Sequence, residues 1–119
     1  MVRFSAAVEA VTGLVLIVDP SLVARFLFGV ELSIGGLAVG RVAGFALFAL
    51  GLACWPQSNG GHRASAAVRG LLAYNSLAAI FFIYLGACRD LTGPLLWPAA
   101  ALHTVLAALL GRVFIMNRD

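Results

Sequence analysis

Six polar side chains lie within stretches of this chain that are otherwise almost wholly apolar. They are Glu9, Arg41, Arg69, Tyr74, Asn75 and His103. An ionised side chain at the centre of a lipid bilayer costs about 2.5–3.5 kcal/mol on insertion scales, so such groups turn inward and find partners. If these stretches are embedded in a membrane, we expect Glu9 to pair with Arg41 or with Arg69. The other three residues would complete an intramembrane polar cluster through hydrogen bonds.

This polar cluster has two interpretations. As a functional site, it would be a proton relay or a polar pocket for a lipid, a quinone or a small cation. As a structural feature, it would fix the packing of the helices through interhelical hydrogen bonds. Both interpretations stay open for Glu9 and Arg41, whereas the structural one is favoured for Tyr74, Asn75 and His103. The sequence predicts no catalytic residue and no metal site.

Long segments without any charged residue must position these groups. Residues 42–62, 70–88 and 91–111 contain no Asp, Glu, Lys or Arg, and they run 21, 19 and 21 residues. A helix of about 20 apolar residues crosses the hydrocarbon core of a bilayer. The chain is 62% hydrophobic and 11% charged, whereas about a quarter of the residues of soluble domains are charged. The sequence therefore predicts an integral membrane protein, with no room in 119 residues for a soluble catalytic domain.

The predicted fold is all-α, a single membrane domain over residues 1–119 that is built as a four-helix bundle. The spanning helices are expected at about residues 3–18, 34–55, 64–87 and 95–115. Between the first two, at about residues 20–31, apolar residues recur at helical spacing around Arg25. This pattern is typical of a short helix lying in the headgroup region. A re-entrant loop is the alternative for this segment.

The arginines predict the orientation of the bundle, because all eight basic residues are arginine. One expected membrane face carries Arg3, Arg63, Arg112 and Arg118. The other carries Arg25 and Arg89, together with three acidic residues. The positive-inside rule then places both termini of a multi-pass protein in the cytoplasm.

Glycines at four-residue spacing form the most specific local pattern in the chain. Gly36, Gly40 and Gly44 make a GxxxGxxxG motif on the second expected spanning helix. Such glycines form a flat groove in which another helix backbone can approach closely. We expect this groove to pack inside the fold rather than against a second subunit, because Arg41 adjoins Gly40 and should also point inward.

Cysteine and histidine spacing gives no cofactor motif. Cys54 and Cys88 are expected at opposite membrane faces, whereas a disulfide needs Cα atoms within about 7 Å, so free thiols are expected. Haem ligation by two histidines is disfavoured, because His62 and His103 lie toward opposite ends of the bundle. No cofactor is firmly predicted, and a quinone or a lipid is the candidate ligand. The expected partners are the lipid bilayer and either further copies of the chain or a larger membrane complex. No basic stripe for nucleic acid is present.

Four segments of the chain are rich in glycine, proline and apolar residues: GLVLIVDP at residues 13–20, VARFLFG at 23–29, RVAGF at 41–45 with Gly51, and GPLLWP at 93–98 leading to His103. These segments resemble small, uncharacterised four-helix bacterial membrane proteins of the DoxX-like superfamily. The resemblance implies a four-helix bundle in the bacterial inner membrane. It also implies a link to membrane oxidoreductases that pass electrons to quinone, because some relatives are small subunits associated with such enzymes.

Together these observations favour a non-enzymatic accessory or assembly subunit of a membrane complex, with a quinone-linked redox complex implied by the resemblance. A quinone- or lipid-binding redox partner is one alternative. A proton-coupled carrier is another, because the architecture resembles that of small multidrug-resistance transporters, which carry one glutamate in the first of four helices. Glu9 would take that role, although Arg41 and Arg69 are poor neighbours for a cation site.

Overall fold

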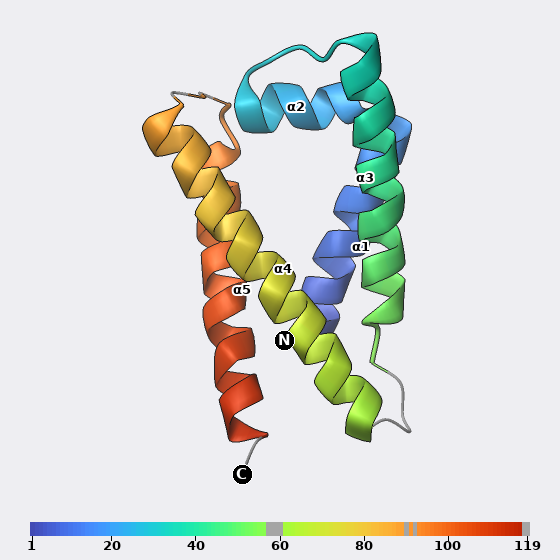
Figure 1. The fold of residues 1–119 in the computed structure, drawn as a ribbon, viewed down its shortest axis with the longest axis vertical. Helices are drawn as coiled ribbons and strands as arrows, with labels where there is room; N and C mark the ends of the chain where they lie inside the picture. Colours follow the sequence, from blue (N-terminus) through green and yellow to red (C-terminus); the bar gives the residue numbers. More distant parts are fainter. Residues whose placement is uncertain (57–60, 90, 92, 118–119) are drawn as a thin grey trace.

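The computed structural model describes residues 1–56, 61–89, 91 and 93–117, with side chains from residue 65 onward in the second range. All regular structure within these residues is helical, which confirms the predicted all-α class. The helices are α1 (Val2–Val18), α2 (Pro20–Phe28), α3 (Ile34–Ala53), α4 (Gly61–Cys88) and α5 (Leu96–Met116). Figure 1 shows α2 lying across one end of the molecule, while the four longer helices run toward the other end.

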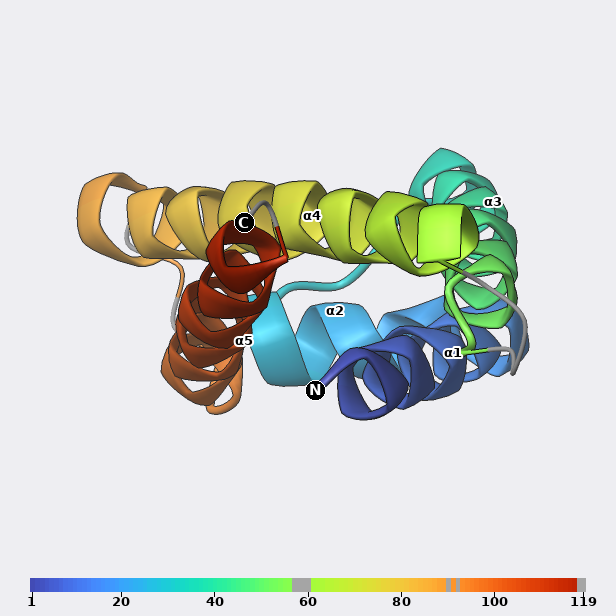
Figure 2. The same ribbon diagram turned by 90° about the horizontal axis from the view of Figure 1, so that it is seen from below.

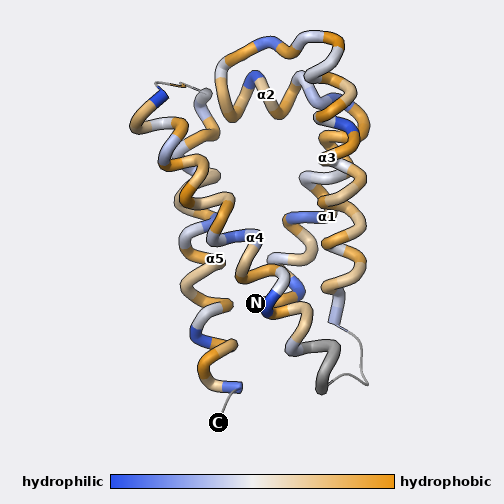
Figure 3. The backbone as a smooth tube through the Cα atoms, in the orientation of Figure 1, coloured by the Kyte–Doolittle hydropathy of each residue, from blue (hydrophilic) through white to orange (hydrophobic). Residues whose placement is uncertain are grey.

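Three of the helices are long and apolar enough to cross a membrane. They are α3, the Ser65–Cys88 part of α4, and α5, each with a mean hydropathy of 1.8. Figure 3 shows hydrophobic colours along most of their length. The longest dimension of the molecule, 46 Å, is close to the thickness of a bilayer with its headgroups, about 40–45 Å. The predicted membrane character is therefore confirmed at the level of helix length and composition.

The predicted fourth span differs from the other three. Over the described residues, α1 alone does not reach the length of a spanning helix, and it qualifies only together with α2. The axes of these two helices are bent by 114°. The described part of the chain thus has three candidate spans, or four if the bent pair of α1 and α2 is counted as one.

Local sequence explains this bend. Asp19 lies between the two helices, and its Oδ1 accepts a hydrogen bond from the Leu22 backbone N–H at 3.3 Å. Pro20 occupies the first turn of α2, where its missing N–H is not needed. At the other end of α2, Gly29 has a left-handed φ of 68°, which glycine adopts without steric cost. The chain therefore leaves α1, forms a short capped helix and turns again before α3.

Close backbone contact joins α1 to α3. A Cβ atom added at Gly44 would lie 2.8 Å from the Gly13 carbonyl oxygen, and one at Gly51 would lie 2.6 Å from the Ala6 carbonyl oxygen. Within the predicted glycine motif, Gly40 lies against the Pro20 ring at the start of α2. A Cβ at Gly36 would meet only Leu32 and Ser33, just before α3. The α1–α3 contact therefore follows Gly44 and Gly51, not Gly36.

The other extensive contact is between α4 and α5, so the long helices form two pairs. Far fewer residues join one pair to the other. Figure 2 shows α2 between them, next to both α1 and α5. The Leu95 backbone N–H donates to the Phe26 carbonyl at 2.8 Å, which attaches α2 to the beginning of α5. Figure 1 places the beginning of α1 and the end of α5 at the end of the molecule opposite α2.

Candidate functional site

A buried hydrogen-bond network centres on the Asn75 side chain of α4. Asn75 Nδ2 donates to Ser5 Oγ of α1 at 3.0 Å and to the Leu71 carbonyl oxygen at 2.8 Å. Asn75 Oδ1 lies 2.8 Å from Nδ1 of His103 on α5. Ser5 and Asn75 are fully buried, and His103 is 8% exposed. One amide therefore connects three helices at a point where the two helix pairs meet.

The network fixes which atoms donate and which accept. A backbone carbonyl can only accept, so the Asn75 nitrogen must face Leu71. The amide oxygen then faces His103, and an oxygen can only accept. His103 Nδ1 must therefore carry the proton of this hydrogen bond, and in a neutral ring Nε2 is left with a lone pair. No hydrogen-bond partner for Nε2 lies among the described residues.

Aromatic rings pack against His103 on two sides. The Tyr74 ring meets it edge-on at a centroid distance of 5.8 Å and an interplanar angle of 80°. The Phe82 ring lies at 5.5 Å with an angle of 57°. Both are offset or edge-to-face arrangements, which aromatic rings prefer to a face-to-face sandwich. These contacts and the bond to Asn75 hold the imidazole in one orientation.

The Glu9 side chain of α1 is completely buried near this network. The Tyr74 side chain lies close to the Glu9 carboxyl group. Among the described residues, however, no atom meets the distance and angle of a hydrogen bond to either Glu9 oxygen. A buried polar group without full hydrogen bonding is costly, and a buried charge without a counter-charge costs still more. Glu9 therefore fits its site best as the uncharged acid.

The arginine partners expected for Glu9 are not in this site. Arg41 is exposed, and its Nε–H donates to the carbonyl oxygen of Ile17, in the last turn of α1, at 3.3 Å. Arg69 is also exposed. Neither the Glu9–Arg41 pair nor the Glu9–Arg69 pair forms, so the expectation of an internal ion pair was wrong. An arginine can place its aliphatic stem along an apolar surface while its guanidinium reaches a polar environment, so these two residues do not need Glu9 as a partner.

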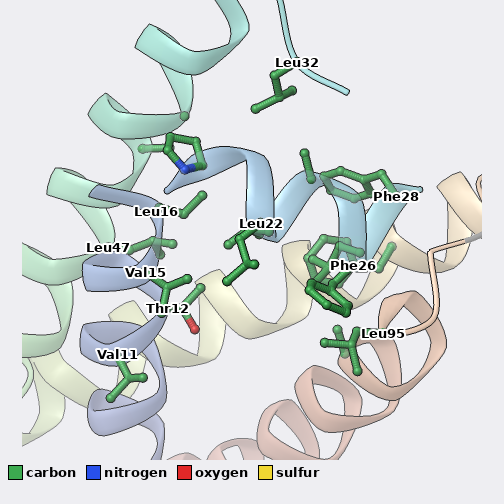
Figure 4. A pocket seen from close by; sticks show the side chains of 18 of the residues that line it. Val11, Thr12, Val15, Leu16, Leu22, Phe26, Phe28, Leu32, Leu47 and Leu95 are labelled. Carbon is green, nitrogen blue, oxygen red and sulfur yellow. The ribbon is translucent and has the colours of Figure 1, made fainter. Parts of the chain in front are cut away.

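A large apolar cavity adjoins the network. It has a volume of about 620 Å³ and is lined by residues of all five helices together with Leu32 and Leu95. Among the described residues that line it, only Thr12, Tyr74 and His103 have polar side chains. Figure 4 shows side chains of α1 and α2 converging on this space, with the Thr12 hydroxyl among them. The cavity thus has aliphatic and aromatic walls and a polar region at Tyr74 and His103.

The structure therefore divides the predicted cluster. It brings together Glu9, Tyr74, Asn75 and His103, and it leaves Arg41 and Arg69 outside. Sequence reasoning missed Ser5, which accepts the Asn75 hydrogen bond. The signal was its spacing, because Ser5 lies four residues before Glu9 and so shares one helix face with it. His62, which the haem hypothesis considered, has its side chain outside the described residues.

Cys54 is buried and Cys88 is exposed, and both are free thiols, as expected. Within the described ranges, no group of three or more His, Cys, Asp or Glu side chains converges to hold a metal ion. Comparison of the chain with models of protein families, with curated proteins and with solved structures finds no match.

Proposed function

We propose that this protein is a small accessory subunit of a membrane complex and that it holds a lipophilic molecule with a polar head, a lipid or a quinone, in the cavity beside His103. The observation that carries the proposal is the shape and chemistry of that space. Its walls are apolar apart from Thr12, Tyr74 and His103, and the His103 ring is already held in place by Asn75. Binding sites for small molecules commonly combine apolar walls with a few fixed polar groups.

The size of the cavity supports this function. About 620 Å³ lies within the usual range for ligand pockets, about 300–1,000 Å³. Apolar surface removed from water contributes about 25 cal/mol per Å². A ligand tail that comes from the bilayer gains less, because it is already out of water. The polar head would then contribute specificity through Tyr74 and His103.

The distribution of the arginines supports a proposal about the orientation of the protein in the membrane. Arg3 and Arg112 belong to the end of the molecule that holds both termini, whereas Arg25 and Arg89 belong to the α2 end. Arg3 also lies over the Trp55 ring at 5.9 Å, which is the kind of aromatic anchor found at membrane interfaces. We propose that both termini face the cytoplasm of a bacterium. The resemblance to the DoxX-like superfamily supports a quinone-linked redox complex as the assembly that the protein joins.

The test is native mass spectrometry of the protein solubilised gently from its own membranes. The wild-type chain should retain a lipophilic small molecule. Ala99→Phe should lose it, because Ala99 lines the cavity and a phenyl group there would fill it. Ala101→Phe is the matched control, since Ala101 is exposed on the same helix and does not line the cavity. Equal retention by both variants, or none by the wild type, would contradict the proposal.

A second function is favoured by one observation, the buried Glu9 carboxyl without a counter-charge. Its neighbour Tyr74 lines the cavity, so the acid could exchange a proton as a small lipophilic cation enters. In this proton-coupled carrier, Glu9→Gln would abolish proton-linked exchange in liposomes and leave the fold intact. Because no ion pair is broken, we expect unfolding stability to change by less than about 1 kcal/mol, whereas breaking a buried pair costs about 3–5 kcal/mol. Unchanged exchange in Glu9→Gln would eliminate the carrier.

A further inference from the structure

We infer that the cavity selects lipophilic molecules whose polar head donates a hydrogen bond, such as a long-chain alcohol or a phenol, over molecules whose head can only accept one. This inference rests on the proposed binding function and narrows its ligand to a lipid with a hydroxyl head or to the reduced quinol form of a quinone, because an oxidised quinone only accepts hydrogen bonds. It follows from the hydrogen-bond network that holds His103.

The first step is the orientation of the Asn75 amide. Its Nδ2 has two acceptors, Ser5 Oγ at 3.0 Å and the Leu71 carbonyl oxygen at 2.8 Å. Turning the amide over would place two oxygens, Oδ1 and the Leu71 carbonyl, against each other in a buried site without a hydrogen between them. This arrangement is costly in a buried site, where neither group can turn to water. The amide oxygen is therefore the atom that faces His103.

The second step is the proton on the imidazole. The Asn75 amide oxygen requires a donor at 2.8 Å, so His103 Nδ1 is the protonated nitrogen. A neutral imidazole has one N–H and one lone pair. His103 is therefore held with the lone pair on Nε2, and the groups that fix it are buried on two other helices, α1 and α4.

The third step is the place of this lone pair. His103 lines the cavity and keeps 8% of its surface exposed. Its Nδ1 edge is covered by Asn75, and its ring packs against Tyr74 and Phe82. Nε2 is thus the polar atom that His103 offers to a ligand. The Tyr74 side chain also lines the cavity, next to the His103 ring.

A ligand with a hydroxyl head would satisfy Nε2, whereas an ether or a ketone would leave Nε2 without a hydrogen-bond donor. One hydrogen bond of this kind, made or left unmade in a buried site, typically changes affinity by about tenfold. The cavity should therefore prefer a hydroxyl head by about tenfold over an otherwise identical head that has no donor.

The experiment compares hexadecanol with hexadecyl methyl ether, which share one tail and differ in the donor. Both are titrated by native mass spectrometry into the purified full-length protein in mild detergent, after endogenous lipid has been removed. The wild-type chain should bind the alcohol about tenfold more tightly. Ala99→Phe should bind neither, which shows that the probes occupy the cavity and not the outer helix faces.

Two further variants locate the preference. His103→Phe should bind the alcohol and the ether alike, because the acceptor is gone and the apolar walls remain. Thr12→Val removes the Thr12 hydroxyl from the cavity wall, and it should leave the tenfold preference intact. A preference that survives in His103→Phe, or that disappears in Thr12→Val, would overturn the assignment to Nε2.

A measurement on the unaltered site does not depend on the folding of the His103→Phe variant. The chain has two histidines, so the His62→Gln variant leaves His103 as the only imidazole to observe by nitrogen NMR. Nδ1 should carry the proton, and the Nε2 resonance should move when the alcohol binds but not when the ether is added. A proton on Nε2 of the neutral ring would overturn the inference.

The outcomes separate this inference from the proposed function. Equal binding of the two probes by the wild-type chain would refute the selectivity and leave the lipophile-binding function standing. Binding of neither probe, together with no retained endogenous molecule, would refute both. Tighter binding of the ether would refute the selectivity alone.

Discussion

At the scale of single residues, whether a polar side chain is buried depends more on the side of the helix that it occupies than on its position along the helix. The sequence predicts that Glu9 and Arg41 both point inward, yet Glu9 is buried and Arg41 is exposed. Side-chain length contributes to this difference. A guanidinium can reach from an apolar surface to a carbonyl group at a helix end, as Arg41 reaches Ile17, whereas a carboxyl group cannot leave its helix so far.

Asn75 should contribute more to stability than any other polar residue of the network. Asn75→Leu removes three hydrogen bonds and leaves the Ser5 hydroxyl and the His103 Nδ1–H without partners. We expect a loss of about 2–3 kcal/mol in the free energy of unfolding. Ser5→Ala removes a single interhelical bond, which in membrane proteins averages about 0.6 kcal/mol. Reversible unfolding in detergent micelles measures both changes.

Tyr84→Phe provides the control for this comparison. Tyr84 is exposed and stacks on Phe81 at a centroid distance of 6.5 Å, so removing its hydroxyl should leave stability unchanged. If Asn75→Leu unfolded no more easily than Tyr84→Phe, the network would have no role in holding the helix pairs together.

At the scale of helices, the sequence was most informative where charge-free runs end at proline, glycine or arginine. The expected segments at 34–55, 64–87 and 95–115 correspond to α3 (Ile34–Ala53), α4 (Gly61–Cys88) and α5 (Leu96–Met116). The expected short helix after Pro20 corresponds to α2. The uniform apolar character that reveals these helices also hides their contacts, because a helix that is apolar on every side has no distinct inward face.

The same limitation explains the glycine motif. Gly36, Gly40 and Gly44 have identical spacing in the sequence, yet α1 contacts Gly44 and then Gly51, seven residues further on. Which glycines lie in an interface depends on the crossing of two helices, and a single helix does not encode this crossing. The partner glycine on α1, Gly13, could be recognised only after the two helices were placed together.

Gly44→Ala tests the α1–α3 contact. The new Cβ would lie 2.8 Å from the Gly13 carbonyl oxygen and 2.9 Å from the Ile17 backbone nitrogen. Backbone atoms cannot rotate away, so the helices must separate, and overpacking of this kind costs about 1–3 kcal/mol. Gly35→Ala is the matched control on the same helix, because its Cβ would meet only Ser33 Oγ at 3.9 Å. There we expect no loss, and a gain of up to about 1 kcal/mol in helix propensity.

Thermal unfolding of both variants in the same detergent gives the comparison. Equal midpoints for Gly44→Ala and Gly35→Ala would show that α1 and α3 do not meet at this point.

At the scale of the whole molecule, the proposed orientation makes a prediction about thiol chemistry. Cys88 is exposed at the end of α4 that lies toward α2. Cys54 is buried and directly follows α3, at the end of that helix that lies away from α2. With both termini in the cytoplasm, Cys88 faces the outside. A maleimide that cannot cross membranes should therefore label intact spheroplasts that contain the wild-type chain or the Cys54→Ser variant. It should not label those that contain Cys88→Ser.

Labelling that requires prior permeabilisation of the spheroplasts would reverse the orientation. The assignment of the candidate membrane-spanning helices would stand after that result, because it rests on hydropathy, whereas the orientation rests on the arginine distribution.

The attachment of α2 has a mechanical consequence. This helix begins at Pro20 and is followed by a glycine at φ 68°. It meets the segment before α5 through the backbone hydrogen bond from Leu95 to Phe26 and through Gly93, which lies against Leu27. The backbones of α1 and α3 are in direct contact at Gly44 and Gly51, and α4 and α5 pack extensively against each other. Both pairs are therefore more firmly packed than α2. Because α2 joins the two pairs through few contacts, we expect a bulky guest to displace this nine-residue helix before it separates either pair.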